Sequence, residues 1–258
     1  MAIICKSPAE LDKMHRAGLV VWDVLSSLRG MVAPGVSTMD LEKFAERRTA
    51  EHRARPAFKG YRGFPCVLCT SVNNEIVHGI PSAARKLKDG DIVSIDYGVQ
   101  LDGYYGDAAV TVPVGRISPE LEKLLRVTRE SLDRAIEQVR LGNRLSDISH
   151  AVQSWVEENG FSVVREFVGH GIGTVMHEEL QVPNYGAPGH GPRLQEGMAL
   201  AIEPMVNMGR PAVRVLEDNW TAVTADGSYS AHFEHTVAVT SNGPSILTRP
   251  KDVTGASW

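Results

Sequence analysis

The sequence has few cysteines, no long apolar run and little net charge, and each absence excludes a class of protein. Three cysteines are an odd, small number, which argues against a disulfide framework and for a reducing compartment. No apolar run approaches the roughly 20 residues that span a bilayer, and the first residues do not resemble a signal peptide. The formal charge of −4 gives no indication of a nucleic-acid partner. We therefore expect a cytoplasmic protein that binds neither nucleic acid directly nor a membrane.

The composition is that of a globular protein. Hydrophobic residues make up 43% of the 258 positions, which is enough apolar material for one sizeable core. The chain contains no low-complexity tract and no obvious linker. We therefore expect a single domain over residues 1–258.

The chain nearly repeats itself. Residues 86–96 resemble residues 193–203 at an offset of 107 positions, and the two copies end on Asp96 and Glu203. Self-similarity at a fixed spacing indicates related structural units. Because the offset is about half the chain, we expect two related halves that face each other across a pseudo-twofold axis. Asp96 and Glu203 would then lie on opposite sides of one central site.

The halves, about residues 1–115 and 116–258, share one order of elements. Each is predicted to run helix, helix, strands, which favours an α+β architecture with helices packed on one face of a largely antiparallel sheet. Ser7 and Glu10 form a capping-box pair at the first helix start. The predicted helices are 7–29, 38–54, 118–139 and 145–159; the predicted strands are 66–72, a hairpin over 92–112 that turns near 101–103, 162–167, 199–202, 214–217, 221–224 and 231–239.

Five side chains are candidate metal ligands. Asp96 and Asp107 lie on the two arms of the predicted hairpin, where opposed positions come within about 5 Å of each other. Glu203 and Glu234 are the corresponding pair in the second half, and His170 adds an imidazole. Carboxylates in buried strands need a compensating cation. Four carboxylates are more than one divalent ion needs, so the natural count is two ions.

Each of these residues also has a purely structural interpretation. Asp107 follows Gly106 and is typical of a turn, His170 lies between two glycines as a loop histidine does, and Glu203 precedes a proline at a strand end. From the pattern alone, both interpretations stay open. The combination of the five residues with the register of the repeat favours a metal site.

Several separate segments carry a resemblance to a known family. Residues 168–173 (VGHGIG), 176–178 (MHE), 201–204 (AIEP) and 233–236 (FEHT) resemble the signature segments of methionine aminopeptidases, as do 73–81 (NNEIVHGIP) and 91–96 (DIVSID). The resemblance covers essentially the whole chain. The lack of an insertion in the second half resembles the type I class, and the lack of a zinc-finger-like extension resembles its bacterial form. The resemblance implies the "pita-bread" α+β fold with internal pseudo-twofold symmetry.

The resemblance also assigns roles to the acids and histidines. Asp96 would be a terminal ligand of one metal, Asp107 and Glu234 would bridge both, and His170 and Glu203 would complete the second ion. The ions would be Mn, Fe(II), Co or Zn. The implied reaction is hydrolysis of the peptide bond after an initiator methionine that precedes a small residue. The remaining implied roles are proton shuttle for Glu203, oxyanion stabilisation for His177, contact with the scissile amide nitrogen for His78, and a monovalent cation on backbone carbonyls near Asn73.

By motif position, an apolar, polarizable pocket should hold the methionine side chain. Two positions depart from the family, since Met176 replaces a frequent aromatic residue and Phe58 a cysteine. The expected partners are N-terminal methionine peptides and nascent chains, with the ribosome as a further candidate, and we expect a monomer. The predicted substrate-binding residues are Tyr61, Phe64, Cys69, His78, Met176, His177 and Trp220.

Other readings remain open at this stage. A proline-directed aminopeptidase or a creatinase-like hydrolase could share the fold, although such enzymes typically carry a further N-terminal domain. A non-catalytic binding protein on the same scaffold would be expected to have lost ligands. Cys66 and Cys69 have the spacing of a redox pair or half a zinc site, but no second pair of cysteines accompanies them.

Overall fold

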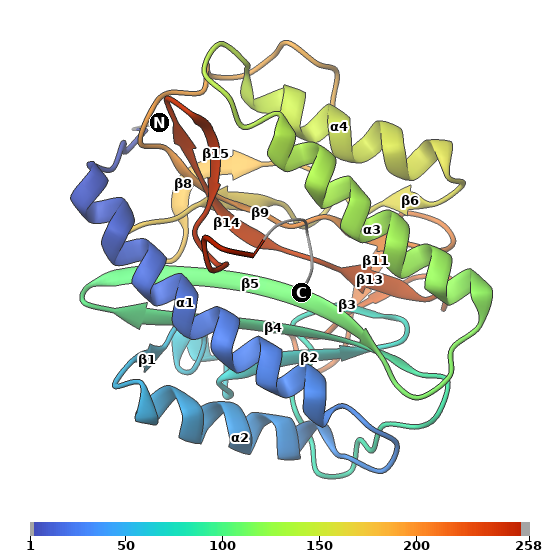
Figure 1. Cartoon of the computed structure of the whole chain (residues 1–258). Coiled ribbons are helices and arrows are strands. Elements are labelled where there is room, and N and C mark those ends of the chain that lie inside the picture. Colours follow the sequence, from blue (N-terminus) through green and yellow to red (C-terminus); the bar gives the residue numbers. More distant parts are fainter. Residues whose placement is uncertain (1–2, 254–258) are drawn as a thin grey trace.

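The computed structural model describes residues 3–253, and two pairs of helices cover one face of a set of antiparallel strands (Figure 1). Helix α1 lies across the long strands β4 and β5, and α2 lies beside α1. Helices α3 and α4 pack on each other over the second half of the chain. No helix in the described range is long and apolar enough to cross a membrane. The helices are α1 (Pro8–Met31), α2 (Thr38–Glu51), α3 (Pro119–Glu137) and α4 (Leu145–Glu158).

Local sequence signals explain where the first and third helices begin. The backbone N–H of Ser7 donates to Glu10 Oε2 at 2.7 Å, and Ser7 Oγ accepts from the Glu10 N–H at 3.4 Å, which completes the predicted capping box. Proline follows the N-cap serine in both helices, where its missing N–H costs no hydrogen bond. The four predicted helices are confirmed to within three residues at each end.

The internal repeat is present in the local structure. The bounds of α4 equal those of α2 shifted by 107 residues, and the isolated bridges Ser37–Lys86 and Arg144–Arg193 obey the same shift. Strands β1 and β6 do so as well. A turn glycine at residue 90 has φ +93°, and its counterpart at residue 197 has φ +87°. Corresponding turns therefore adopt the same left-handed conformation.

Within residues 3–253 the strands form four antiparallel groups. One group has the order β1-β4-β2, with β5 also paired to β4, and a second has the order β15-β14-β9-β7-β8. Two smaller groups, β13-β10-β6 and β11-β12-β3, complete the set. The strands are β1 (Arg55–Pro56), β2 (Leu68–Val72), β3 (Glu75–Val77), β4 (Ile92–Leu101), β5 (Tyr104–Pro113), β6 (Ser162–Val163), β7 (Gly169–Gly171), β8 (Glu178–Val182), β9 (Ala199–Ile202), β10 (Met205–Asn207), β11 (Val213–Val215), β12 (Ala222–Thr224), β13 (Ser230–His232), β14 (His235–Thr240) and β15 (Gly243–Ile246).

Three sequence-based expectations are wrong in detail. Asp96 and Asp107 are not directly opposed, because Asp96 pairs with Ala109 and Asp107 pairs with Gly98. They are diagonal neighbours on the same face, still within reach of one shared ion. The expected single strand over 231–239 is two strands, β13 and β14, with residues 233–234 between them. The predicted strand over 162–167 shortens to the two residues of β6.

Side chains from the two halves also bond directly across the centre. Thr236 Oγ1 donates to the Asp107 carbonyl at 2.8 Å, and Thr111 Oγ1 donates to the His232 carbonyl at 2.8 Å. The Glu234 N–H donates to the Ala109 carbonyl at 2.9 Å. These hydrogen bonds therefore join strand β5 to the segment between β13 and β14, although β5 shares a sheet with neither of those strands.

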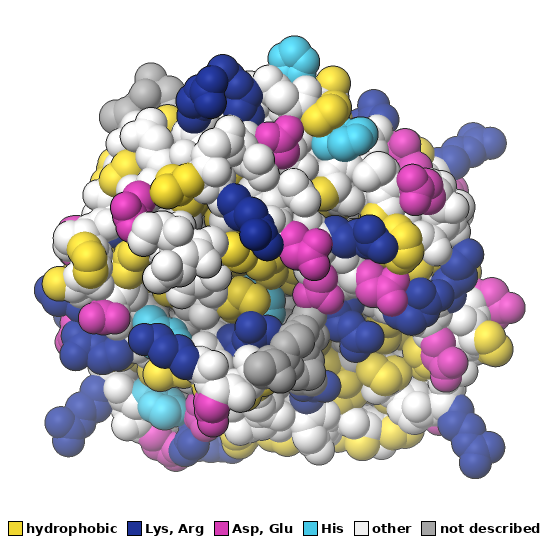
Figure 2. Space-filling view, turned by 45° about the horizontal axis from the view of Figure 1, so that its top comes forward, with side chains coloured by type: hydrophobic (Ala, Val, Ile, Leu, Met, Phe, Trp, Pro, Cys, Tyr) yellow, Lys and Arg dark blue, Asp and Glu magenta, His cyan; other side chains and the backbone are white. Residues whose placement is uncertain are grey.

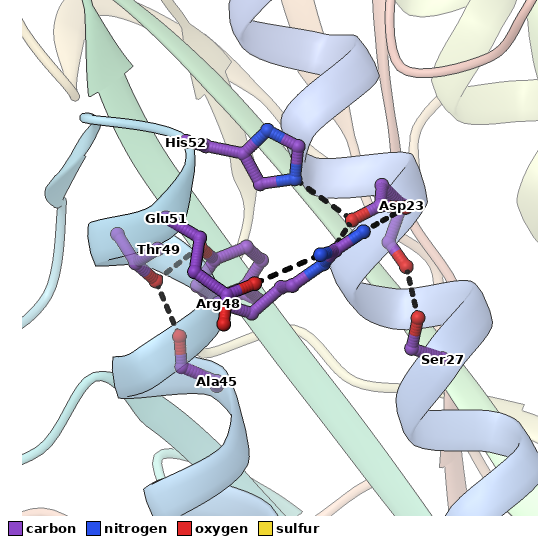
Figure 3. Close-up of polar contacts among 8 residues, drawn as sticks. Asp23, Ser27, Ala45, Arg48, Thr49, Glu51 and His52 are labelled. Carbon is purple, nitrogen blue, oxygen red and sulfur yellow. Dashed lines mark hydrogen bonds and ion pairs between the residues drawn. The ribbon is translucent and has the colours of Figure 1, made fainter.

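An ion-pair cluster joins α1 to α2 on the outside (Figure 3). Asp23 on α1 accepts from Arg48 Nε at 2.8 Å and pairs with His52 Nε2 at 2.8 Å. Arg48 also reaches Glu51 at 2.8 Å. The hydrogen bond from Arg48 lowers the pKa of Asp23 from its usual value. Since α2 buries only one face, these contacts fix its position beside α1.

Candidate metal centre

The structure brings the five predicted ligands to one place at the centre of the molecule. Asp96 lies in the middle of β4, and Asp107 lies near the start of β5. His170 is the central residue of β7, and Glu203 directly follows β9. Glu234 lies in the break between β13 and β14. Each half therefore contributes two carboxylates, and the second half adds the imidazole.

Three of these side chains are close enough to hold one ion. Ligand atoms of Asp107, His170 and Glu234 all lie within 4.8 Å of one another, and all three residues are buried. His170 Nε2 is 4.0 Å from Asp107 Oδ2 and 3.8 Å from Glu203 Oε1. His170 Nδ1 faces its own neighbour, the Gly171 carbonyl, at 3.0 Å. That contact fixes the ring so that Nε2 faces the acids, as a metal-ligating histidine requires.

Burial and mutual repulsion disfavour the ionised form of these acids. Burial raises the pKa of Asp107 to about 7. Burial, followed by the charges of neighbouring acids, raises the pKa of Asp96, Glu203 and Glu234 well above the usual range. Burial lowers the pKa of His170 to about 3, so its imidazole is neutral and its lone pair is available.

Orphaned oxygen atoms test whether these residues fit a cation. Asp96 Oδ1, Asp107 Oδ1 and Glu234 Oε1 are buried without a hydrogen-bond partner within the described chain. Buried polar atoms almost always have partners, so three orphans on neighbouring carboxylates indicate that a cation supplies the missing contacts. Four carboxylates and one imidazole form an oxygen-rich set that suits divalent transition ions. The residues present therefore fit divalent metal.

Backbone contacts hold the second-half ligands, which lie at strand ends. Asn184 Nδ2 donates to the Glu203 carbonyl at 3.0 Å. The Phe233 N–H donates to the Pro204 carbonyl at 3.3 Å, next to the Glu234 contact with β5. These hydrogen bonds replace the ladder that a continuous strand would supply.

A cavity of about 490 Å³ opens onto the acids. All seven residues expected at the substrate line it, so the structure brings them together with the metal ligands. Phe64, Cys69 and Met176 form an apolar cluster with Phe58, and Trp220 packs against that cluster. The remaining lining residues, to which no sequence pattern assigns a role at the site, are Arg62, Val168, Gly169, Glu178, Glu179 and Gln181.

Two further histidines face this cavity. The His177 ring lies 4.1 Å from the His170 ring and stacks on Tyr61 at 5.1 Å. His78 has a left-handed backbone with φ +60°, and its ring packs edge-on against Trp220 at 6.3 Å. Burial lowers the pKa of His78 to about 4 and also lowers the pKa of His177. Both rings are therefore neutral near pH 7 and offer one N–H donor each.

A buried ion pair supports the loop that carries His177. Lys6 Nζ lies 2.6 Å from Glu178 Oε2, and both side chains are less than one-tenth exposed. The Lys6 N–H also donates to the Gly197 carbonyl at 2.7 Å. The segment before α1 is thus fastened beneath the cavity wall. No sequence signal links these residues, which are 172 positions apart.

The two clustered cysteines are buried free thiols. Burial raises the pKa of Cys66 to about 11 and raises that of Cys69 well above its usual value. A thiol needs a low pKa to act as a nucleophile or redox centre. The chemistry of the pair therefore favours a packing role in the apolar cluster over a redox function.

Comparisons with known proteins agree with this geometry. Residues 12–241 match the model of metallopeptidase family M24. The chain is 55% identical over 246 residues to a methionine aminopeptidase of Clostridium perfringens, which covers 95% of this chain and 98% of that protein. It is 55% identical over 247 residues to methionine aminopeptidase 1 of Bacillus subtilis, covering 96% and 99% of the two chains.

Solved structures give the same result. The crystal structure of a methionine aminopeptidase from Thermotoga maritima superposes with a TM-score of 0.95 at 49% identity, covering 96% of this chain and 100% of the other. A prolidase from Pyrococcus horikoshii OT3 superposes with a TM-score of 0.77 at 21% identity, and the match covers 64% of that longer chain. The prolidase shares the fold alone.

The fold and the buried acid cluster are those of a metal-dependent peptidase with the pita-bread fold. The chain belongs to metallopeptidase family M24. Among the members named here, its similarity is high to the methionine aminopeptidases and low to the prolidase.

Proposed function

We propose that this protein removes the N-terminal methionine from nascent proteins and from peptides whose second residue is small. The observation that carries the proposal is the position of the acids. Four carboxylates, of which Asp107 and Glu234 are buried and Asp96 and Glu203 half-buried, line with a neutral imidazole a cavity whose wall is apolar and rich in polarizable side chains. That wall suits a flexible thioether, and the base suits hydrolysis.

The proposed metal ligands divide between two divalent ions. Asp96 would bind one ion, Asp107 and Glu234 would bind both, and His170 and Glu203 would complete the other. Mn, Fe(II), Co and Zn all fit this donor set. Bound there, the ions would lower the pKa of a water molecule and polarise the scissile carbonyl.

The residues of the chain supply the proton transfers. Glu203 accepts a proton from the attacking water, and the proton passes to the amide nitrogen as the carbon–nitrogen bond breaks. The His177 N–H stabilises the carbonyl oxygen as that oxygen gains negative charge. His78, which also lines the cavity, would hydrogen-bond the scissile amide nitrogen. Methionine and a shortened chain with a free amino group leave.

The apolar wall selects the side chain that is removed. Phe64, Cys69 and Trp220 present aromatic and sulfur surface, with Tyr61 next to His177. Met176 replaces the more usual aromatic residue but remains apolar and buried. A charged or β-branched first residue would leave this surface poorly filled or its own charge unpaired.

Several further expectations belong to the same proposal. Residues 1–258 would form one catalytic domain with pseudo-symmetric halves of about 1–115 and 116–258. The protein would act as a cytoplasmic monomer on nascent chains, with the ribosome as a candidate partner. A monovalent cation would lie on backbone carbonyls near Asn73, whose φ is +61°.

Peptide hydrolysis tests the proposal directly. A Met-Ala-led peptide should be cleaved, with loss of activity in chelator and recovery on addition of Mn, Fe(II) or Co. X-Pro peptides, the substrates of a proline-directed enzyme on this fold, should not be cleaved. Cleavage of X-Pro peptides in place of Met-Ala peptides, or metal binding without any hydrolysis, would contradict the proposal.

A further inference from the structure

A second cavity, of about 550 Å³, lies on the helical face of the molecule, away from the acids. It is formed by the end of α1, the end of β5, the loop that follows β5, and the first half of α3. Figure 2 shows this face tilted forward, with several Lys and Arg side chains around its middle beside hydrophobic surface. No residue of the cavity lining is shared with the metal centre.

Arginines dominate the charged lining. Arg29 comes from the last turn of α1, Arg116 from the loop, and Arg126 and Arg129 from α3, against one lining acid, Glu122. A monomeric protein normally mixes charges of both signs on its surface. Four guanidinium groups around one hollow therefore need an explanation.

Carboxylates near the cavity account for only part of this charge. Glu130 forms an ion pair with Arg126, and its two carboxylate oxygens lie 3.2 and 3.3 Å from Arg126 Nη1. Burial raises the pKa of Asp133 to about 6, and the charge of nearby Arg129 offsets part of that rise. Arg29 and Arg116 have no ion pair with any residue in 3–253. Two guanidinium groups at the cavity thus lack a paired carboxylate among the described residues.

Arg29 is the informative member of this pair. Its side chain is half-buried, and burial together with the charge of Arg129 lowers the pKa of Arg29. A guanidinium that is both desolvated and close to a like charge is unfavourable unless an anion joins it. Planar guanidinium groups bind phosphate oxygens in a bidentate manner, so a cluster of them suits a phosphate group.

Apart from Glu122 and Thr111, the rest of the lining is apolar. Val110, Ile117, Leu125 and Phe233 contribute hydrophobic surface beside the arginines. A volume of about 550 Å³ is that of a small-molecule pocket and exceeds what one inorganic ion fills. The ligand should therefore carry an organic group as well as a charged one.

We propose that this cavity, called here the arginine pocket, binds a small organic phosphomonoester. Its dianionic phosphate would lie between Arg29, Arg116 and Arg129, with the organic part against Leu125 and Phe233. The proposal is independent of the peptidase reaction. Phe233 precedes Glu234, so the pocket lies behind the segment that carries a metal ligand, and its ligand does not enter the substrate cavity.

Calorimetric titration of the metal-loaded full chain tests the proposal, with adenosine monophosphate and inorganic phosphate as probes and adenosine as the uncharged comparison. The monophosphate should bind with a Kd below about 1 mM. Adenosine should bind at least about tenfold more weakly, because it lacks the group that the arginines contact. Inorganic phosphate should bind more weakly than the monophosphate, because it lacks the organic part.

Matched variants locate the binding site. Arg29→Met and Arg116→Met should each weaken monophosphate binding by about tenfold or more. Arg140→Met removes an exposed arginine outside the pocket and should leave the affinity unchanged. Asp96→Asn should also leave it unchanged, because the metal centre takes no part. The proposal is overturned if neither phosphate binds, if adenosine binds as tightly, if Arg29→Met and Arg116→Met retain the affinity, or if Asp96→Asn abolishes it.

Discussion

The two halves of the molecule supply the metal centre in different ways. The first half presents Asp96 and Asp107 on one continuous hairpin, in which all ten residues of β4 pair with β5. The second half presents Glu203 after a four-residue strand and Glu234 in a gap between two strands. The hairpin holds its ligands through its own ladder, whereas the second half depends on individual contacts from other elements. Equivalent positions of an internal repeat can thus contribute ligands to one site while different kinds of contact hold those ligands in place.

The largest effect should come from removing one ligand from either half. Asp96→Ala and Glu234→Ala should each lower kcat/KM for a Met-Ala peptide by roughly a thousandfold or more, about 4 kcal/mol, because both halves serve one centre. Asp102→Asn, at an exposed hairpin turn, should have no effect and is the control. If either alanine variant kept more than about a tenth of the activity, the contribution of that half would be refuted.

The next largest effect should come from breaking the buried Lys6–Glu178 ion pair, which supports the His177 loop in the second half. Lys6→Met should cost about 3 kcal/mol of unfolding free energy, because it leaves Glu178 buried without its partner. It should also lower kcat, because the loop with His177 loses its anchor. Lys59→Met removes an ion pair of the same 2.6 Å length whose side chains are about half exposed, and it should cost less than about 1 kcal/mol. Equal losses in chemical denaturation would contradict the distinction between the two pairs.

The metal-free protein should lose stability as the pH rises from 7 to 9. Acids whose pKa is raised well above the usual range, such as Asp96 and Glu234, keep a proton in the folded state that they have lost in the unfolded state, whereas Asp107, at about 7, loses its proton near the start of this range. Each retained proton makes stability fall by roughly 1.4 kcal/mol per pH unit. Below about pH 6.5 the buried histidines, whose folded pKa is lowered, act in the opposite sense.

Thermal unfolding in chelator at several pH values measures this slope. Asp96→Asn should flatten it, and saturating Mn should abolish it, because bound cations keep these acids ionised in the folded state as they are in the unfolded state. A metal-free protein that grows more stable between pH 7 and 9 would show that the acids are not strained by their mutual charge.

The smallest effect should come from the cavity wall. Met176→Phe exchanges one large apolar side chain for another, so we expect kcat/KM for Met-Ala peptides to change by less than about tenfold. Met176→Asp would place an unpaired charge against the substrate and should reduce it much further. Steady-state kinetics on both variants make the comparison. A loss of about a hundredfold in Met176→Phe would mean that wall shape matters more than apolar character.

The sequence predicts the first half better than the second for a physical reason. Regular hydrophobic patterning and caps mark the helices and the long hairpin, so their positions were predicted closely. The register of that hairpin could not be predicted, because a pattern of apolar residues does not determine which residues of the two strands lie opposite each other. The break at residues 233–234 was missed, because the surrounding apolar run reads as one strand.

Long-range contacts were not predictable from one sequence. The pairing of Lys6 with Glu178 leaves no spacing signal, and the arginine pocket gathers residues from α1, β5, the loop after β5 and α3, which local patterns do not connect. The five metal ligands could be predicted because each lies in a short, recognisable segment. Their convergence depended on the repeat, whose counterparts at residues 90 and 197 share a turn conformation.

Anomalous X-ray scattering from crystals grown with Mn tests the central claim most directly. The account predicts two strong peaks a few ångströms apart, both contacted by Asp107 and Glu234, with Asp96 at one peak and His170 at the other. A fully folded, Mn-saturated protein with no peak among these side chains would contradict it.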